Sequence, residues 1–275
     1  MISEINPDAP MSGHNPNILD KITANKRLEI VEAKAAVSVA RLEESQLFHR
    51  ECYSLRESML NPERTGIIAE FKRASPSKGI INDKVSVAEV TSGYTAAGAS
   101  ALSVLTDTSF FGGSKRDLTE ARTVNNIPIL RKDFILDEYQ IIEAKAIGAD
   151  VILLISAILT PGEIAKLSKL AKDLGMSVLL EVHNKEELER SLCNTLDAVG
   201  VNNRNLKDFT LSLQHSYDLI EVIPNQFIKV SESGISDSQT IKELKAVGFQ
   251  GFLMGENFMK QDDPGGAMKE FVQML

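Results

Sequence analysis

Residues 147–184 read IGADVILLISAILTPGEIAKLSKLAKDLGMSVLLEVHN, and the order of their parts indicates the architecture. The apolar run 151–155 is followed by a segment of helix length that begins at Pro161, and then by Gly175 and a second apolar run at 177–182. Proline favours the first position of a helix, and glycine favours the position just past its end. Short runs that are apolar throughout are typical of strands buried on both faces of a parallel sheet. The stretch therefore predicts a strand–helix–strand unit.

The same unit recurs from residue 67 to the C-terminus. The eight expected strands are Ile67–Phe71, Ala101–Leu105, Pro128–Arg131, Asp150–Ile155, Ser177–Val182, Ala198–Asn202, Ile228–Glu232 and Gln250–Met254. Eight consecutive units fit a closed barrel better than an open sheet. The GxGxxG motif that a dinucleotide-binding open sheet carries after its first strand is also absent. We predict an α/β fold, a (β/α)8 TIM barrel with an N-terminal helical extension.

The N-terminal region differs from the repeat. Residues 1–15 contain two prolines and a glycine and are predicted to be a flexible extension. Residues 17–48 carry apolar side chains at helical spacing and predict one or two helices. We expect the apolar face from Ile18 to Val31 to fold over the barrel mouth. The expected organisation is a single domain over residues 16–275, with the N-terminal helices at 16–62 belonging to it.

Composition limits the classes of partner. The formal net charge of -8 argues against nucleic acid, whose phosphates require clustered cations. The apolar runs are too short to span a bilayer, and the N-terminus lacks the pattern of a signal peptide, so we expect a cytoplasmic protein. Cys52 and Cys193 match no metal or redox spacing and are expected to be reduced, mostly buried thiols.

Polar side chains stand at the C-terminal ends of most of the expected strands. They are Glu70, Lys72, Lys132, Glu181, Asn202 and Glu232. The active site of this fold lies at that end of the barrel. Carboxylates and amines that share one concave space shift each other's pKa and can supply an acid and a base near neutral pH. A purely stabilising ring of ion pairs is the alternative, but the spread over so many strands favours an active site.

A phosphate site is indicated beside this group. Loops after the seventh and eighth strands form the usual phosphate cradle of this fold, and here they carry Ser233-Gly234 and Gly255-Glu256. The segment from Lys72 to Lys78 adds cations and hydroxyls, among them Ser75.

At these residues the sequence resembles the indole-3-glycerol phosphate synthase family. The matching stretches are Ile67–Gly79, Ile129–Ile135 with Tyr139-Gln140, Leu179–His183, Gly200–Leu206 and Ser231–Ile235. The resemblance implies closure of the indole ring of 1-(2-carboxyphenylamino)-1-deoxyribulose 5-phosphate, with loss of carbon dioxide and water, in tryptophan biosynthesis.

The resemblance also implies the roles of single residues. Lys132 would be a general acid and Glu181 the general base of the dehydration. Lys72 would contact the substrate's carboxylate or phosphate, or supply a second acid. Glu70 and Asn202 would orient the lysines and the substrate hydroxyls. Glu232 would support them.

The substrate's two ends would be held by different groups. Ser75, Arg204, Ser233 and the backbone at Gly234, Gly255 and Glu256 would bind the phosphate. Phe110, Phe111 and Phe134 would form an apolar wall for the anthranilate ring. No cofactor and no metal are expected. Phe258 departs from the family pattern, because it places a bulky aromatic residue where smaller ones are usual.

Several alternatives stay open or are set aside. His183 is expected to begin a loop rather than to act in catalysis. Phosphoribosylanthranilate isomerase, a barrel of the same pathway, carries a cysteine where the first strand here ends with Glu70 and Lys72. A catalytically silent barrel that binds a phosphorylated ligand is the remaining alternative. The expected partner is a small phosphorylated substrate. We expect a monomer, although the sequence does not determine the oligomeric state.

Overall fold

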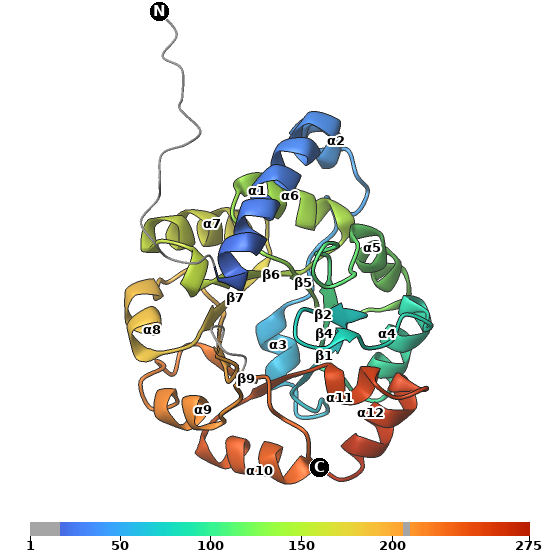
Figure 1. Cartoon of the computed structure of the whole chain (residues 1–275), viewed down its shortest axis with the longest axis vertical. Helices are drawn as coiled ribbons and strands as arrows, with labels where there is room; N and C mark the ends of the chain where they lie inside the picture. Colours follow the sequence, from blue (N-terminus) through green and yellow to red (C-terminus); the bar gives the residue numbers. More distant parts are fainter. Residues whose placement is uncertain (1–16, 206–209) are drawn as a thin grey trace, which may run out of the picture.

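The computed structural model describes residues 17–205 and 210–275, and within them eight parallel strands close into a barrel (Figure 1). Around the barrel the strands follow the order β1-β10-β9-β8-β7-β6-β5-β4. Their bounds are β1 Ile67–Phe71, β4 Ala101–Leu105, β5 Ile129–Lys132, β6 Val151–Ile155, β7 Ser177–Val182, β8 Ala198–Asn202, β9 Ile228–Glu232 and β10 Gly251–Met254. The predicted (β/α)8 TIM barrel is confirmed. The predicted flexible extension, residues 1–15, lies outside the described part of the chain.

Three strands start one residue later than predicted, and β5 also ends one residue later, at Lys132. Pro128 has no N–H to donate to a neighbouring strand, which explains the later start of β5. The loop after β1 holds a two-residue hairpin that the sequence did not predict, formed by β2 (Ala74–Ser75) and β3 (Gly79–Ile80). Strands this short carry no alternation that a sequence pattern could reveal.

Helices surround the barrel on its outside (Figure 1). They are α4 Val87–Ala96, α5 Lys115–Val124, α6 Glu138–Ile147, α7 Pro161–Asp173, α8 Lys185–Ser191, α9 Gln214–Leu219, α10 Ser238–Val247, α11 Glu256–Met259 and α12 Pro264–Val272, with a 3-10 turn η1 at Ser156–Ile158. In α7, Pro161 occupies the first position, as predicted, and the side chain of Thr160 caps the first turn.

Alternation along each strand separates two buried clusters. In β1, Ile67, Ala69 and Phe71 pack outward in the cluster beneath the helices, whereas Ile68 joins the cluster in the barrel interior. Glu70 lies on the same face as Ile68, because side chains two residues apart in a strand point the same way. Its carboxylate is therefore directed into the barrel at its C-terminal end.

The N-terminal segment contributes helices at both ends of the barrel. It forms α1 (Ile18–Ala36), α2 (Val39–Glu43) and α3 (Leu55–Leu60), and Figure 1 shows α1 across the rim beside β5, β6 and β7. In α3, Leu55 and Met59 join the interior cluster together with residues that begin strands, such as Ala101 and Val151. This helix therefore packs at the N-terminal end of the barrel.

Two general predictions agree with the structure. Among the residues that the structure describes, no helix combines the length and the apolar character needed to cross a bilayer. Cys52 and Cys193 are free thiols whose partly buried side chains pack against the cluster beneath the helices, which agrees with the expectation of mostly buried thiols. The buried Lys145 donates a hydrogen bond from Nζ to Cys52 Sγ over 3.0 Å.

Candidate active site

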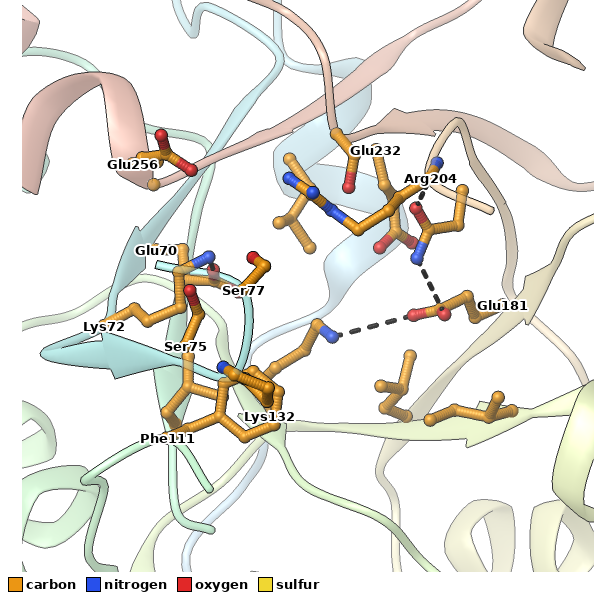
Figure 2. A pocket seen from close by; sticks show the side chains of 18 of the residues that line it. Glu70, Lys72, Ser75, Ser77, Phe111, Lys132, Glu181, Arg204, Glu232 and Glu256 are labelled. Atoms are coloured by element: carbon orange, nitrogen blue, oxygen red, sulfur yellow. Dashed lines mark hydrogen bonds and ion pairs between the residues drawn. The ribbon is translucent and has the colours of Figure 1, made fainter. Parts of the chain in front are cut away.

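One cavity at the C-terminal end of the barrel is lined by every site residue named from the sequence except Phe110 (Figure 2). Those residues are Glu70, Lys72, Ser75, Phe111, Lys132, Phe134, Glu181, Asn202, Arg204, Glu232, Ser233, Gly234, Gly255 and Glu256. Phe110 packs instead against the interior cluster as a partly buried side chain. Ser77, Ile235 and Asn257 also line the cavity, and the sequence did not single them out.

Lys132 and Glu181 point toward each other across the cavity (Figure 2). Lys132 Nζ lies 3.6 Å from Glu181 Oε2. The other oxygen of Glu181 accepts a hydrogen bond of 3.0 Å from Asn202 Nδ2. At the opposite wall, Lys72 Nζ donates to Glu70 Oε1 over 2.7 Å. The cavity thus contains two lysine–glutamate pairs.

Charged groups of the cavity shift the pKa of Lys132 and that of Glu70. Burial lowers the pKa of Lys132, but the carboxylates of Glu181, Glu70 and Glu232 outweigh burial and hold this pKa above its ordinary value. Burial raises the pKa of Glu70, and the nearby Lys72 and Lys132 more than reverse the effect, so its pKa lies below the ordinary value. At neutral pH Lys132 is therefore protonated and Glu70 is ionised.

The pKa of Glu232 is shifted upward, in contrast to that of Glu70. Burial, followed by repulsion from Glu181, raises the pKa of Glu232 to about 8. Its Oε1 is buried and accepts no hydrogen bond from the described residues. Gly200 on β8 makes room for it, because a Cβ at that position would lie 2.0 Å from Glu232 Oε1. A protonated carboxyl group therefore stands among the charged residues at neutral pH.

We expect Glu232→Gln to flatten the pH dependence of stability. The pKa of Glu232 is about 8 in the folded chain against 4.5 ordinarily. Its stabilising contribution is therefore fully present below the lower value and is lost as pH rises through the higher one. Urea denaturation from about pH 5 to about pH 9 should show a steeper fall in unfolding free energy for the wild type than for the variant. Equal slopes would contradict the assignment.

The predicted phosphate residues lie on the side of the cavity formed by β8, β9 and β10 and the hairpin after β1. Ser233 and Gly234 follow β9 in the left-handed conformation, with φ of 68° and 78°. For a non-glycine residue this conformation costs on the order of 1–3 kcal/mol and is concentrated at functional sites. The backbone N–H of Arg204 donates to Asn202 Oδ1 over 3.0 Å, which fixes the start of the loop after β8.

The apolar part of the cavity combines α1 with two phenylalanines. Phe111 and Phe134 lie with their ring centroids 6.0 Å apart. Ile18, Leu19 and Ile22 of α1 complete the wall. The expectation that the apolar face would extend to Val31 is wrong at its far end, because Leu28 and Val31 are 65% and 67% exposed. Only the first turns of α1 lie over the mouth.

A buried ion cluster anchors α1 in this position. Lys26 is 3% exposed, and its Nζ lies 2.9 Å from Asp133 Oδ1, 3.0 Å from Asp107 Oδ2 and 2.5 Å from Glu29 Oε2. Asp133 directly follows Lys132, and its other oxygen accepts hydrogen bonds from Thr106 and Arg131. The helix that covers the cavity is therefore tied to the strand end that carries Lys132. Sequence reasoning missed Lys26, which looks like the exposed lysines of the same helix.

Phe258 does not enter the cavity. It is 1% exposed and packs against Tyr94 and Phe271, with ring centroids 5.8 Å and 5.6 Å away. The bulky residue that departs from the family pattern is therefore directed into the helical layer, and the backbone of Gly255 and Glu256 still lines the cavity.

Solved structures share the fold at low sequence identity. The 3-hexulose-6-phosphate synthase of Salmonella typhimurium superposes with a TM-score of 0.60 at 14% identity and covers 77% of this chain and 98% of its own. A chain of the tryptophan synthase complex of Pyrococcus furiosus gives a TM-score of 0.58 at 16% identity and covers 76% and 97%. These likenesses concern the barrel alone.

Sequence comparison identifies the family. The family description "Indole-3-glycerol phosphate synthase" matches residues 19–271. The chain is 45% identical over 259 residues to the indole-3-glycerol phosphate synthase of Bacteroides thetaiotaomicron, covering 94% of this chain and 99% of that protein. It is 43% identical over 251 residues to that of Burkholderia ambifaria, covering 90% and 96%. The chain therefore belongs to the indole-3-glycerol phosphate synthase family.

Proposed function

We propose that the barrel mouth closes the indole ring of 1-(2-carboxyphenylamino)-1-deoxyribulose 5-phosphate by acid–base catalysis between Lys132 and Glu181. Membership of the family makes the chain a carboxy-lyase of tryptophan biosynthesis. The observation that carries the proposed mechanism is the Lys132–Glu181 pair, in which a partly buried lysine on β5 and a buried glutamate on β7 face one cavity.

Lys132 acts first in this proposal. The aryl carbon that bears the carboxylate attacks the substrate's carbonyl carbon, and Lys132 donates a proton to the carbonyl oxygen. A protonated lysine is required for this step, and the surrounding carboxylates keep Lys132 in that state at neutral pH. Departure of carbon dioxide then returns the bonding electrons to the ring system.

Glu181 acts in the dehydration. Its carboxylate removes a proton from the ring-closed intermediate while an acid protonates the departing hydroxyl group. Asn202 holds one oxygen of Glu181 by a hydrogen bond, which leaves the second oxygen directed at the cavity. Lys72, which pairs with Glu70, would supply the second acid or hold the substrate's carboxylate.

Binding energy from both ends of the substrate would position the reacting atoms between these groups. Ser75, Arg204, Ser233 and the backbone at Gly234, Gly255 and Glu256 would hold the phosphate. Phe111, Phe134 and the first turns of α1 would contact the anthranilate ring. This division is supported by the strands that carry these residues, since Ser233 and Gly234 follow β9 and Gly255 follows β10, whereas Phe134 follows β5.

We also propose that residues 16–275 form a single domain and that the enzyme works as a monomer. Contacts of α1 with the mouth and of α3 with the interior cluster support the first point. The cavity brings all the proposed catalytic residues together, so the proposed chemistry does not require a residue from a second copy.

Glu181→Gln tests the division of labour between acid and base. We expect kcat for indoleglycerol phosphate formation to fall roughly 100- to 10,000-fold, the usual contribution of a positioned base. Because the block falls after decarboxylation, one equivalent of carbon dioxide per enzyme should still appear in a single turnover. Product fluorescence and carbon dioxide release would be followed together. Simultaneous loss of both signals would place Glu181 in an earlier step and count against its assigned role.

A further inference from the structure

We propose that His183, held by Glu187, carries protons between a second cavity and Glu181. This inference rests on the proposed function, because it assumes that Glu181 and Lys132 exchange protons with the substrate. His183, which the sequence analysis set aside, would transfer the proton, and Glu187, which the sequence analysis did not name, would position the ring.

The three side chains form a continuous row. His183 follows the last residue of β7, and its Nε2 lies 3.5 Å from Glu181 Oε1. On the other side of the ring, Nδ1 lies 3.2 Å from Glu187 Oε2. The same oxygen accepts the backbone N–H of His183 over 2.9 Å, so Glu187 holds both the ring and the chain that carries it. Within the described residues His183 Nε2 is buried and makes no hydrogen bond, which leaves it available to Glu181.

The row crosses the wall between two cavities. Glu181 lines the cavity at the barrel mouth. His183 and Glu187 line a separate cavity between α8 and α9, together with His215. Asn202 and Arg204 line both cavities and so form part of the wall between them. A proton that moves along the row therefore passes from one cavity to the other.

The proposed reaction needs such a passage. Written with an ionised carboxylate, the substrate and one proton give the product, carbon dioxide and water. Lys132 loses a proton to the carbonyl oxygen, and an acid loses a second to the departing hydroxyl, whereas Glu181 gains only one from the intermediate. One proton per turnover must therefore enter from solvent. While the substrate occupies the mouth, the second cavity offers another way in.

The transfer balances with the groups present. After ring closure Lys132 is neutral. The N–H bond at His183 Nε2 breaks as an O–H bond forms at Glu181 Oε1. Rotation of the protonated carboxyl group then brings this proton to Lys132 Nζ, which lies beside Oε2, and the O–H bond breaks as the new N–H bond forms. Glu181 is then ionised again, as the dehydration requires. The neutral ring recovers a proton from solvent in the second cavity. The 3.5 Å gap must shorten for transfer, as catalytic hydrogen bonds commonly do when substrate binds.

The charged groups that face His183 favour this role. They are Glu181 from β7, Glu187 from α8 and Lys132 from β5. Burial lowers the pKa of His183, as does the charge of Lys132. The hydrogen bond to Glu187 and the charges of both carboxylates outweigh them and hold the pKa above its ordinary value. The ring therefore carries a proton to donate in the range in which histidine usually titrates.

His183→Gln is the direct test, with His215→Gln as the matched control in the same cavity. We expect His183→Gln to lower kcat about tenfold in dilute buffer, less than loss of a catalytic base because water partly replaces the ring. KM should stay within about twofold of the wild type, since the mouth is untouched. Added imidazole should restore kcat of His183→Gln. The wild type and His215→Gln should not respond to imidazole.

A second variant separates relay from packing. Glu187→Gln keeps a hydrogen-bond acceptor for the ring but removes a charge that raises the pKa of His183, so the pH profile of kcat should shift to lower pH. Wild-type kcat in His183→Gln, or a loss that imidazole does not restore, would overturn the relay. Glu181→Gln, assayed in the same experiment, distinguishes the proposed acid–base mechanism from the proposed relay through His183. If it still loses product formation while His183→Gln does not, only the relay fails.

Discussion

Replacing Lys132 by alanine is expected to lower kcat/KM for indoleglycerol phosphate formation by about 1,000-fold or more, and to abolish the carbon dioxide burst as well. A positioned general acid contributes on the order of 100- to 10,000-fold. The variant also removes the cation that Glu181, Glu70 and Glu232 face. Because ring closure precedes decarboxylation, neither carbon dioxide nor product should form. Initial rates of product fluorescence and single-turnover carbon dioxide release would measure both effects.

Lys78→Ala is the matched control for that experiment. Lys78 lies near the same mouth but is mostly exposed, and its Nζ is 3.6 Å from Glu256 Oε1. Exposed ion pairs contribute little, so its loss should change kcat/KM by a few-fold at most. Substantial activity in Lys132→Ala, with carbon dioxide released at the wild-type rate, would transfer the first acid step to another residue, with Lys72 as the obvious candidate.

Replacing Lys26 by methionine should produce the largest loss of stability among the substitutions considered. Three carboxylates surround its ammonium group within 3.0 Å, and Asp107 and Asp133 are almost fully buried. Removing one partner of a buried ion pair costs about 3–5 kcal/mol, because the remaining charges stay desolvated. Urea denaturation should show this loss as a lower midpoint. Lys21→Met, at an exposed position of the same helix, should leave the midpoint nearly unchanged.

The same variant connects stability with substrate binding. Lys26 ties α1 to Asp133, next to Lys132, and α1 contributes Ile18, Leu19 and Ile22 to the cavity. KM of Lys26→Met should therefore rise even under conditions where the variant remains folded. An unchanged KM in a clearly destabilised protein would show that α1 contributes to folding but not to the binding of substrate.

The barrel could be predicted from the sequence because its signals are local. A buried parallel strand is apolar along its whole length, and Val151–Ile155 shows this without reference to any other part of the chain. Polar residues such as Lys132 and Glu181 come at the ends of such strands. The closure of the barrel then brings these ends together, since parallel strands share one orientation.

The remaining features depend on distant partners. Lys26 lies in a helix rich in lysine, and only the approach of Asp107 and Asp133 from two loops separates it from exposed neighbours. Gly200 reads as an ordinary small residue until Glu232 on the next strand occupies the space beside it. The ring of His183 is held by Glu187, which lies about one helical turn further along the chain. Such contacts between distant residues cannot be predicted from a periodic pattern along the chain.

We propose above all that this barrel mouth performs the ring closure with its own acid and base groups. The most direct test supplies the carboxyphenylamino-deoxyribulose phosphate to the wild-type protein in the presence of a metal chelator and follows product fluorescence. We predict multiple turnovers, with one carbon dioxide released per indoleglycerol phosphate formed. A well-folded protein whose thermal stability rises with substrate, as ligand binding requires, but which forms no product, would contradict the proposal and establish a silent phosphate-binding barrel.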